Sequence, residues 1–326
     1  MTNEILLTIS IPTYNGASTI QRLIDSILKQ YDSRIEVLVS NNKSTDNIQS
    51  IIKAYSNISY FCNENNVGAD RNIALSIERA KGKYVWLIGD DDYLEDGAIS
   101  YILNILSSYQ NLGAVFVNFS LFDTRKKIFL KEKWLDIESD IYCKNANIFL
   151  EIAGISTNFL SSVIHNKKAF INSNYHKYFD SNWVQFGSLY DYLVDYDAFC
   201  VSKPFVVNAG ESFEGEGNSN GRSISILCNL MEIVSSFPSY YSKKNIELSR
   251  NKIKLYLSRK ISSAKRLGFK LNIEILKKLI INFGDNPKFW IFQLPLLLLP
   301  NFCHKLIYKV YKIDIINKLY WKFKRL

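Results

Sequence analysis

Apolar and polar positions alternate along residues 1–110 in a pattern that predicts short buried strands separated by amphipathic helices. Wholly apolar runs of strand length are followed by segments in which apolar residues recur every three or four positions. The expected strands are Glu4–Ile11, Arg34–Val39, Ile58–Cys62 and Lys83–Ile88, and the expected helices are Ala17–Lys29, a short helix through Ile51, and Val67–Ala80. This alternation predicts an α/β fold, with a mostly parallel central sheet and helices on both faces.

The pattern is looser after residue 111. It still predicts strands at Ala114–Phe122, Phe159–His165 and Phe199–Val207, and a helix at Phe186–Tyr196. Residues 208–221 contain four glycines and no apolar period, which predicts a mobile loop, either a lid or a disordered connection. From Ser223 the sequence is helical in pattern to its end. We therefore expect three regions, at 1–110, 111–222 and 223–326.

Composition narrows the class of protein. Hydrophobic residues make up 47% of the 326 positions, which is typical of a globular protein and excludes a disordered one. None of the five cysteines forms a C-x-x-C pair, so zinc and redox sites have little support. Their odd number and wide spacing predict reduced thiols in a cytosolic compartment. The N-terminal sequence predicts no secretory signal, and the longest apolar stretch, Phe289–Phe302, is too short and too broken by proline to predict a membrane span.

Charge is distributed unevenly. Residues 1–242 carry 20 basic and 27 acidic residues, whereas residues 243–326 carry 20 basic and 4 acidic residues, for a total of +9. A basic tail of this kind indicates either a polyanion or anionic membrane surface as its partner, or simply a well-solvated helical surface.

Polar motifs follow four of the expected strands. In parallel sheets, ligands bind outside the carboxyl ends of the strands, so these motifs are expected to meet at one edge. The motifs are Ile9-Ser-Ile-Pro-Thr-Tyr-Asn15, Val37-Leu-Val-Ser-Asn-Asn-Lys-Ser-Thr-Asp46, Asn65-Asn-Val-Gly-Ala-Asp-Arg-Asn72 and Lys81-Gly-Lys-Tyr-Val-Trp-Leu-Ile-Gly-Asp-Asp-Asp92. The last motif places three carboxylates on one turn, and carboxylate oxygens suit Mg²⁺ or Mn²⁺.

In order and spacing, these four motifs resemble those of glycosyltransferase family 2, which has the GT-A fold. The resemblance covers residues 4–110 strongly and 155–215 weakly. Within the family the chain is most similar to bacterial O-antigen transferases of the abequosyltransferase type, which share the Asn-Val-Gly-x-Asp-Arg-Asn segment and a stretch like Leu160–Ile164. The resemblance implies a nucleotide-sugar-binding half at 1–110, an acceptor-binding half at 111–222 and an all-helical C-terminal region.

The resemblance also implies roles for matching positions. Thr13 and Tyr14, with their neighbours Pro12 and Asn15, would hold the nucleotide, and the ring of Tyr14 would stack on the base. Arg71 would reach the diphosphate. Asp91 matches the metal-binding Asp of the family's Asp-x-Asp motif, with Asp90 at the nucleotide and Asp92 at the metal. The first Asp of that motif is Gly89 here, so a ribose or second metal contact is in doubt.

Asn42 occupies the position where relatives often carry an Asp that reads uracil. An amide can both donate and accept, whereas an ionised Asp cannot donate. Asn42 is therefore at least as compatible with cytosine as with uracil. We expect a CDP-linked donor, with dTDP- and UDP-linked sugars left open.

The general base is the weakest part of the resemblance. Inverting relatives place a Glu-Asp pair about 20 residues before a strand that ends in a Pro-containing turn, and its Asp deprotonates the acceptor hydroxyl. Here the corresponding segment is Trp183-Val-Gln185, which has no carboxylate. Asp180, Asp191 and Asp195 are the nearest candidates. A displaced base and a retaining reaction that needs no such base both remain open.

The tail interleaves aromatic residues with Lys and Arg, as in Lys305-Leu-Ile-Tyr-Lys-Val-Tyr-Lys312. This pattern fits a helix lying in a membrane interface, so we expect a peripheral protein on the cytoplasmic face of the cell membrane. The alternative is that these helices pack on the catalytic body. The resemblance implies an acceptor saccharide carried on a polyprenyl diphosphate. Nucleic acid is not expected as a partner, because the body is acidic. A sugar nucleotidyltransferase would need a Gly-rich phosphate loop, which is missing, and a non-catalytic assembly protein that retains the fold stays open.

Overall fold

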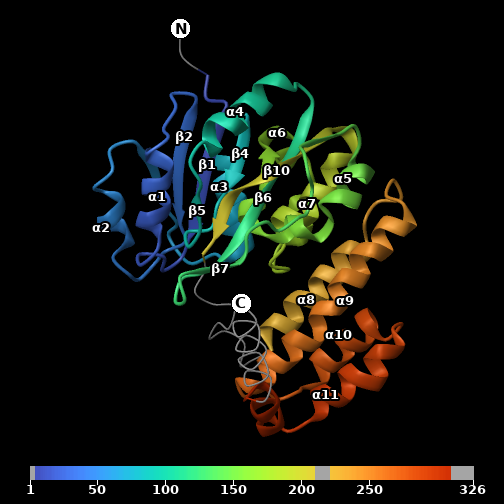
Figure 1. Cartoon of the computed structure of the whole chain (residues 1–326). Coiled ribbons are helices and arrows are strands. Elements are labelled where there is room, and N and C mark those ends of the chain that lie inside the picture. Colours follow the sequence, from blue (N-terminus) through green and yellow to red (C-terminus); the bar gives the residue numbers. More distant parts are fainter. Residues whose placement is uncertain (1–3, 210–220, 310–326) are drawn as a thin grey trace, which may run out of the picture. The chain divides into compact units, whose positions relative to one another are not determined.

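The computed structural model describes residues 4–209 and 221–309. The chain divides into two compact units (Figure 1). The first comprises residues 1–211 and 236–249, and the second comprises residues 212–235 and 250–326. The mobility predicted for the loop 208–221 concerns residues that, from 210 to 220, lie outside the described part of the chain.

The first unit is built on one sheet. Its described strands are β1 (Leu7–Thr13), β2 (Ile35–Asn41), β3 (Ile58–Cys62), β4 (Tyr84–Leu87), β5 (Tyr93–Leu94), β6 (Leu112–Asp123), β7 (Ile128–Lys131), β8 (Ile141–Cys143), β9 (Val163–Asn166) and β10 (Asp197–Asn208). The main order is β3-β2-β1-β4-β9-β6-β10-β5, with β7 paired to β6 and β8 to β10.

The sheet is mixed. Strands β3, β2, β1 and β4 are parallel, as the alternating pattern predicts, and β6 is parallel to β10. Strand β9 is antiparallel to both β4 and β6, and joins the two parallel sets. Because β9 reverses direction between them, the carboxyl ends of both sets lie at the same edge of the sheet.

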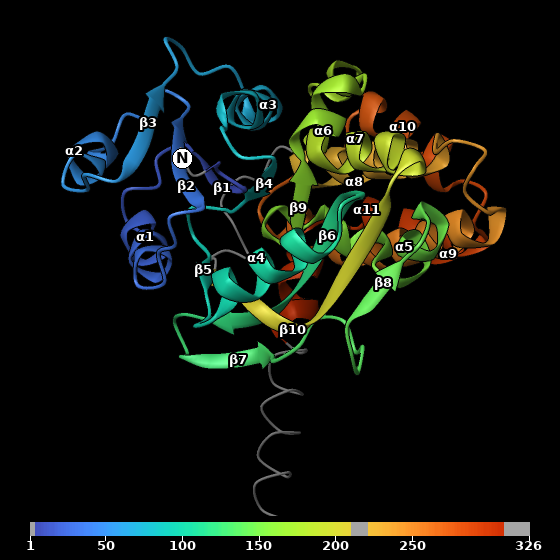
Figure 2. The ribbon, with the colours of Figure 1, turned by 90° about the horizontal axis from the view of Figure 1, so that it is seen from above.

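Helices cover both faces of this sheet (Figure 2). Helices α1 (Ile20–Leu28) and α4 (Ala98–Ser108) lie on one face, and α3 (Ala69–Arg79), α6 (Lys167–Asn172) and α7 (Val184–Tyr192) lie on the other. The short helices α2 (Ile48–Ile52) and α5 (Ala146–Ile152) lie towards the two sides of the sheet. The expected helix at 67–80 starts only at Ala69, because Gly68 has φ +86°, a conformation that ends regular helix and favours glycine.

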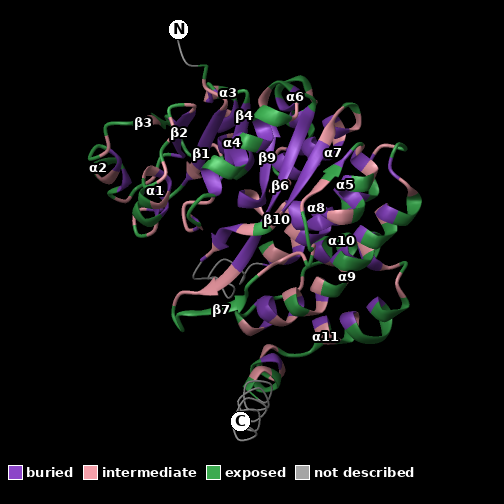
Figure 3. Cartoon of the chain, turned by 45° about the horizontal axis from the view of Figure 1, so that its top comes forward, coloured by how far each residue is buried: buried purple, intermediate pink, exposed green. Residues whose placement is uncertain are grey.

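Burial follows the sequence pattern (Figure 3). Every residue of β2 and β4 is buried, as are most residues of β6, whereas all four residues of β7 are exposed. In α1 the buried positions are Ile20, Leu23, Ile24 and Ile27, the helical spacing that predicted this element. The core of the first unit therefore lies on both faces of the sheet, between the strands and the helices that cover them.

The second unit is helical, as expected. Its described elements are α8 (Arg222–Ser235), the part of α9 (Lys243–Arg266) from residue 250 onward, α10 (Ile273–Phe283), a π-helical turn at Phe289–Gln293 and α11 (Leu294–Leu298). Its core contains Leu227, Met231, Leu257, Leu279 and Phe283. Within the described residues, no single helix is long and apolar enough to cross a membrane, although the bent pair Phe289–Leu298 and Asn301–Lys309 passes that test together.

Candidate active site

The predicted motifs meet at the carboxyl edge of the parallel strands. In the register of β1 and β2, Pro12 lies beside Ser40 and Thr13 beside Asn41, the last residues of the two strands. Strand β4 pairs with β1 on its other side and leads into Gly89–Asp92, which we call the acidic turn. Tyr14, which follows β1, is 48% exposed, and its stacking on a base remains a prediction.

Thr13 and Asp90 hold the first strand end against the acidic turn. The Thr13 hydroxyl donates a hydrogen bond to Asp90 Oδ2. Burial raises the pKa of Asp90 to about 6, and the hydrogen bond from Thr13 opposes that rise. Gly16 makes room for this pair, because a Cβ there would lie 2.6 Å from Asp90 Cγ and 2.7 Å from Thr13 Oγ1. Gly16 is a site residue that the sequence analysis missed.

Ser161 organises the other side of the acidic turn. The Gly89 N–H donates to Ser161 Oγ over 2.9 Å, and the Ser161 hydroxyl donates to Asp92 Oδ2 over 2.5 Å. Asp92 is buried and also accepts a hydrogen bond from the backbone N–H of Ala209. Burial, followed by the charge of Asp91, raises the pKa of Asp92 well above its usual value. Ser161 belongs to the Leu-Ser-Ser stretch named above, which was the available signal.

The three consecutive carboxylates therefore point to different partners. Asp90 faces Thr13 and Asp92 faces Ser161, while the carboxylate of Asp91 accepts no hydrogen bond from the described residues. The backbone carbonyl of Asp91 accepts from Arg22 over 2.5 Å. Among residues 4–209 and 221–309, no three His, Cys, Asp or Glu side chains are grouped to hold a metal ion. The assignment of Asp91 as a metal ligand therefore remains a prediction, and a cation there would need further ligands from a substrate.

Asn15 ties the first motif to the second. Its side-chain oxygen accepts from the Thr45 N–H over 2.8 Å, and its own N–H donates to Ser44 Oγ over 2.9 Å. Asn15 has φ +59°, a left-handed conformation that asparagine tolerates better than most residues. Asn15 thus shapes the loop that presents Tyr14.

Asn42 is buried, and its amide is saturated by protein atoms. The side-chain oxygen accepts from the Val67 N–H (2.9 Å) and from the Asn63 amide (3.1 Å). The side-chain nitrogen donates to Asn66 (2.9 Å) and to the Gly68 carbonyl (3.3 Å). In this structure Asn42 holds the segment that leads into α3, and its contact with a base remains a prediction.

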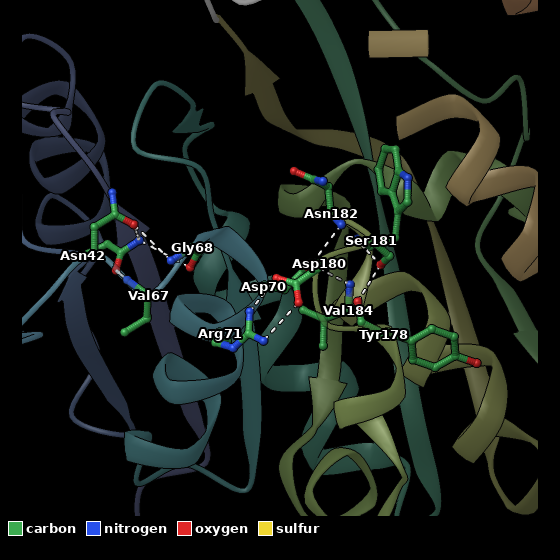
Figure 4. Close-up of polar contacts among 12 residues, drawn as sticks. Asn42, Val67, Gly68, Asp70, Arg71, Tyr178, Asp180, Ser181, Asn182 and Val184 are labelled. Atoms are coloured by element: carbon green, nitrogen blue, oxygen red, sulfur yellow. Dashed lines mark hydrogen bonds and ion pairs between the residues drawn. The ribbon is translucent and has the colours of Figure 1, made fainter. Parts of the chain in front are cut away.

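Arg71 and Asp180 were predicted for separate roles, and the structure pairs them (Figure 4). Two guanidinium nitrogens meet the two carboxylate oxygens of Asp180 at 2.5 and 3.0 Å. The guanidinium also lies over the ring of Phe179, 4.8 Å from its centroid. This bidentate pair brings the candidate base next to the predicted diphosphate ligand.

Asp70, the residue before Arg71, holds the turn at residues 179–184 that contains Asp180. It is buried, and its two oxygens accept the backbone N–H groups of Asn182 (2.8 Å) and Val184 (3.1 Å). Burial raises the pKa of Asp70, and these backbone hydrogen bonds oppose the rise. Asp70 lies within the third predicted motif, but the family resemblance implies no role for it.

Asp191 is differently placed. In the described structure it forms an ion pair with Lys177 at 2.7 Å and accepts a hydrogen bond from the Tyr178 hydroxyl at 2.9 Å. Neither partner is among the predicted site residues. Of the three candidate bases, Asp180, Asp191 and Asp195, Asp180 is the one that the described residues show in contact with another predicted site residue.

Comparison with known proteins decides the family. The sequence model of glycosyl transferase family 2 matches residues 8–175, just over half of the chain. The chain belongs to that family. It is therefore a glycosyltransferase, and it is 28% identical over 274 residues to the abequosyltransferase RfbV of Salmonella typhimurium, which covers 75% of this chain and 78% of that protein.

Solved structures of GT-A glycosyltransferases share the fold. S. aureus TarS in complex with UDP-GlcNAc superposes with a TM-score of 0.59 at 15% identity, covering 86% of this chain and 80% of that one. The mannosyltransferase PcManGT of Pyrobaculum calidifontis, in complex with GDP-Man and Mn²⁺, gives a TM-score of 0.53 at 14% identity, covering 90% and 84%. These likenesses confirm the GT-A fold expected from the motifs, and family membership supports a nucleotide-sugar donor.

Proposed function

We propose that this family 2 glycosyltransferase moves a sugar, a deoxyhexose, from a nucleotide-sugar to a saccharide carried on a polyprenyl diphosphate, in the synthesis of O-antigen or another surface polysaccharide. The observation that carries the proposal is that Tyr14, Arg71 and Asp91 each lie on a segment that follows a parallel strand, β1, β3 and β4 respectively. The similarity to an abequosyltransferase over three quarters of the chain supports both the sugar class and the pathway class.

Donor binding follows from the chemistry of that edge. The exposed ring of Tyr14 offers a stacking surface for the base, and Arg71 offers a planar cation for the diphosphate. Asp91 would hold Mg²⁺ or Mn²⁺, and Asp92 is the second predicted metal ligand. The metal would neutralise charge on the diphosphate as it leaves. Asp90, Pro12, Thr13 and Asn15 shape the surface against which the nucleotide lies.

The identity of the donor's nucleobase is tested by calorimetry with CDP, UDP, dTDP and GDP in the presence of Mn²⁺. We propose CDP, because an amide at position 42 both donates and accepts. Because the Asn42 amide is engaged with residues 63–68, this preference requires those contacts to rearrange on binding. Tighter binding of UDP than of CDP would reject the proposed base.

Asp91→Ala tests the metal. The variant is expected to lower metal-dependent release of the nucleotide on the order of a hundredfold, because the leaving diphosphate loses its counterion. Asp96→Ala is the matched control, since it removes an exposed carboxylate on the same segment, where Asp96 pairs with Lys29. The assay uses membrane-extracted lipid-linked acceptor, with NMR of the product linkage. Unchanged release by Asp91→Ala would refute the metal role.

Attachment to the cytoplasmic membrane surface is proposed for the helical unit. Its segment 290–302 exposes large apolar side chains to solvent: Trp290, Ile291, Phe292, Leu298 and Phe302. The surrounding residues 243–326 carry a net charge of +16, which suits an anionic leaflet. Exposed aromatic residues beside basic residues are typical of helices that lie in an interface.

A further inference from the structure

The turn at residues 179–184 is held by two consecutive residues of α3 in two different ways (Figure 4). Asp70 is buried and binds backbone N–H groups, whereas Arg71 reaches over the surface to the Asp180 carboxylate. The side chains of Arg71 and Asp180 are 41% and 76% exposed. The buried contacts fix the backbone of the turn, and the exposed ion pair is free to exchange partners without unfolding it.

The backbone of the turn keeps Asp180 directed at Arg71. Asp180 has φ +66° and Asn182 has φ +67°, both in the left-handed region that Asp and Asn tolerate. Asp70 holds this conformation by accepting hydrogen bonds on either side of Trp183. Loss of the ion pair would leave the Asp180 carboxylate near the same place, because its backbone is fixed independently.

Arg71 is the group that a diphosphate would also seek. It lies in the first turn of α3, where unpaired backbone N–H groups add positive potential, and its planar fork matches phosphate as well as carboxylate. An exposed carboxylate binds a guanidinium only weakly, so a doubly charged ligand with a metal ion competes effectively.

We propose that Asp180 and the donor diphosphate compete for Arg71, so that donor binding releases Asp180 to accept the proton of the acceptor hydroxyl. This inference rests on the proposed function. In the step, the acceptor oxygen forms a bond to the anomeric carbon, the bond from that carbon to the phosphate oxygen breaks, and its electron pair leaves on the diphosphate. The hydroxyl proton passes to the Asp180 carboxylate. The base is therefore available only when donor is present.

Asp180→Asn separates the two roles. It removes the competitor, so the variant is expected to bind nucleoside diphosphate about two- to fivefold more tightly than the wild type, while its kcat for transfer falls on the order of a hundredfold. Calorimetry with CDP, UDP, dTDP and GDP plus Mn²⁺ gives the affinities. In an Arg71→Ala background, the substitution at Asp180 should no longer tighten binding.

Asp32→Asn is the matched control. It breaks another bidentate Arg–Asp pair, with Arg34 at 2.8 and 2.9 Å, at the opposite end of the strands. It should change neither affinity nor kcat. If the wild type binds a nucleotide but Asp180→Asn binds it no more tightly, the competition is overturned while the proposed function stands. If tightening occurs with unchanged kcat, the proton-accepting role is overturned. If the wild type binds none of the four nucleotides, both proposals fail.

Discussion

Ser161 shows how one hydroxyl holds an acidic turn together. It accepts a hydrogen bond from Gly89 and donates one to Asp92, so its two hydrogen-bonding directions are both used inside the protein. The indole N–H of Trp86 also donates to its backbone carbonyl over 2.9 Å. Ser161 thus joins Gly89 and Asp92, the first and last residues of the acidic turn.

Ser161→Ala is expected to lower the free energy of unfolding by about 1–3 kcal/mol, because the buried Asp92 carboxylate loses a hydrogen-bond donor. Urea unfolding followed by circular dichroism measures the change. Ser100→Ala, on the exposed face of α4, serves as the control and should stay within about 0.5 kcal/mol of the wild type. Equal stability of the two variants would contradict the role given to Ser161.

His165 gives the protein a measurable response to acid. It is wholly buried in β9, its Nδ1 lies 2.9 Å from the Tyr192 hydroxyl, and burial lowers its pKa to about 3. Between that value and the unfolded pKa of about 6.5, the unfolded chain binds a proton that the folded chain does not. The stability that His165 contributes is therefore complete above pH 6.5 and is lost as the pH falls.

Wild-type protein is accordingly expected to lose about 1.4 kcal/mol more stability per pH unit than His165→Gln between about pH 6.5 and 4.5. The buried carboxylates of the acidic turn act in the opposite direction, so the comparison is made between the two proteins and not from one curve. Urea midpoints across that range provide the measurement. Parallel curves for the two proteins would show that His165 is not held neutral.

At the scale of elements, α3 is the part that links the two halves of the site. The turn before it binds Asn42, and its first turn binds residues 180–184. The helix itself was predictable from its apolar spacing, and the motifs placed Thr13 and the acidic turn at strand ends, but their contact comes from the structure alone. The Arg71–Asp180 pair was not predictable, because 109 positions separate the two residues and no local pattern relates them.

The sheet shows a similar limit. Each parallel strand of the first four has an apolar run that predicts it, and β3 was predicted to the residue. The reversal at β9 has no signature in its sequence, since a buried strand looks the same in either direction. The expected strand at 159–165 is shorter than predicted, because Leu160–Ser162 forms a 3₁₀ turn that brings Ser161 to the acidic turn.

Asp70→Asn tests the hold of α3 on its turn. An amide offers one acceptor oxygen where the carboxylate offers two, so one of the N–H groups of Asn182 and Val184 loses its partner. Hydrogen exchange of these two amides is expected to be about tenfold faster or more. In Asp32→Asn the same amides should exchange at the wild-type rate. Unchanged exchange in Asp70→Asn would mean that other contacts fix the turn.

At the scale of the whole molecule, the two units differ in charge and in exposed surface. The acidic α/β unit carries the candidate active site, and the basic helical unit exposes apolar side chains at 290–302. An acceptor on a polyprenyl lipid is confined to a membrane, so an enzyme held at that surface meets it at a higher local concentration.

The double substitution Phe292→Asp and Phe302→Asp is expected to weaken binding to vesicles of phosphatidylglycerol and phosphatidylethanolamine tenfold or more. Each ring that enters the membrane would contribute about 2 kcal/mol to the free energy of binding. Sedimentation with the vesicles measures the bound fraction. Tyr31→Asp changes an equally aromatic, exposed residue of the α/β unit and is the control. Retention of full vesicle binding by the double variant would argue against this segment as the membrane contact.

Trp183 lies in the turn at residues 179–184 and makes changes in that turn detectable by fluorescence. It stands between Asn182 and Val184, the two residues whose amides Asp70 binds, and its ring meets Phe186 edge-on at 6.5 Å. Indole emission responds to small changes in its surroundings, so the turn contains its own optical reporter. A change of partner at Arg71 would be visible as a fluorescence transient after rapid mixing with nucleotide, with no label attached. The order in which donor and acceptor bind would then follow from which of the two produces the fluorescence change.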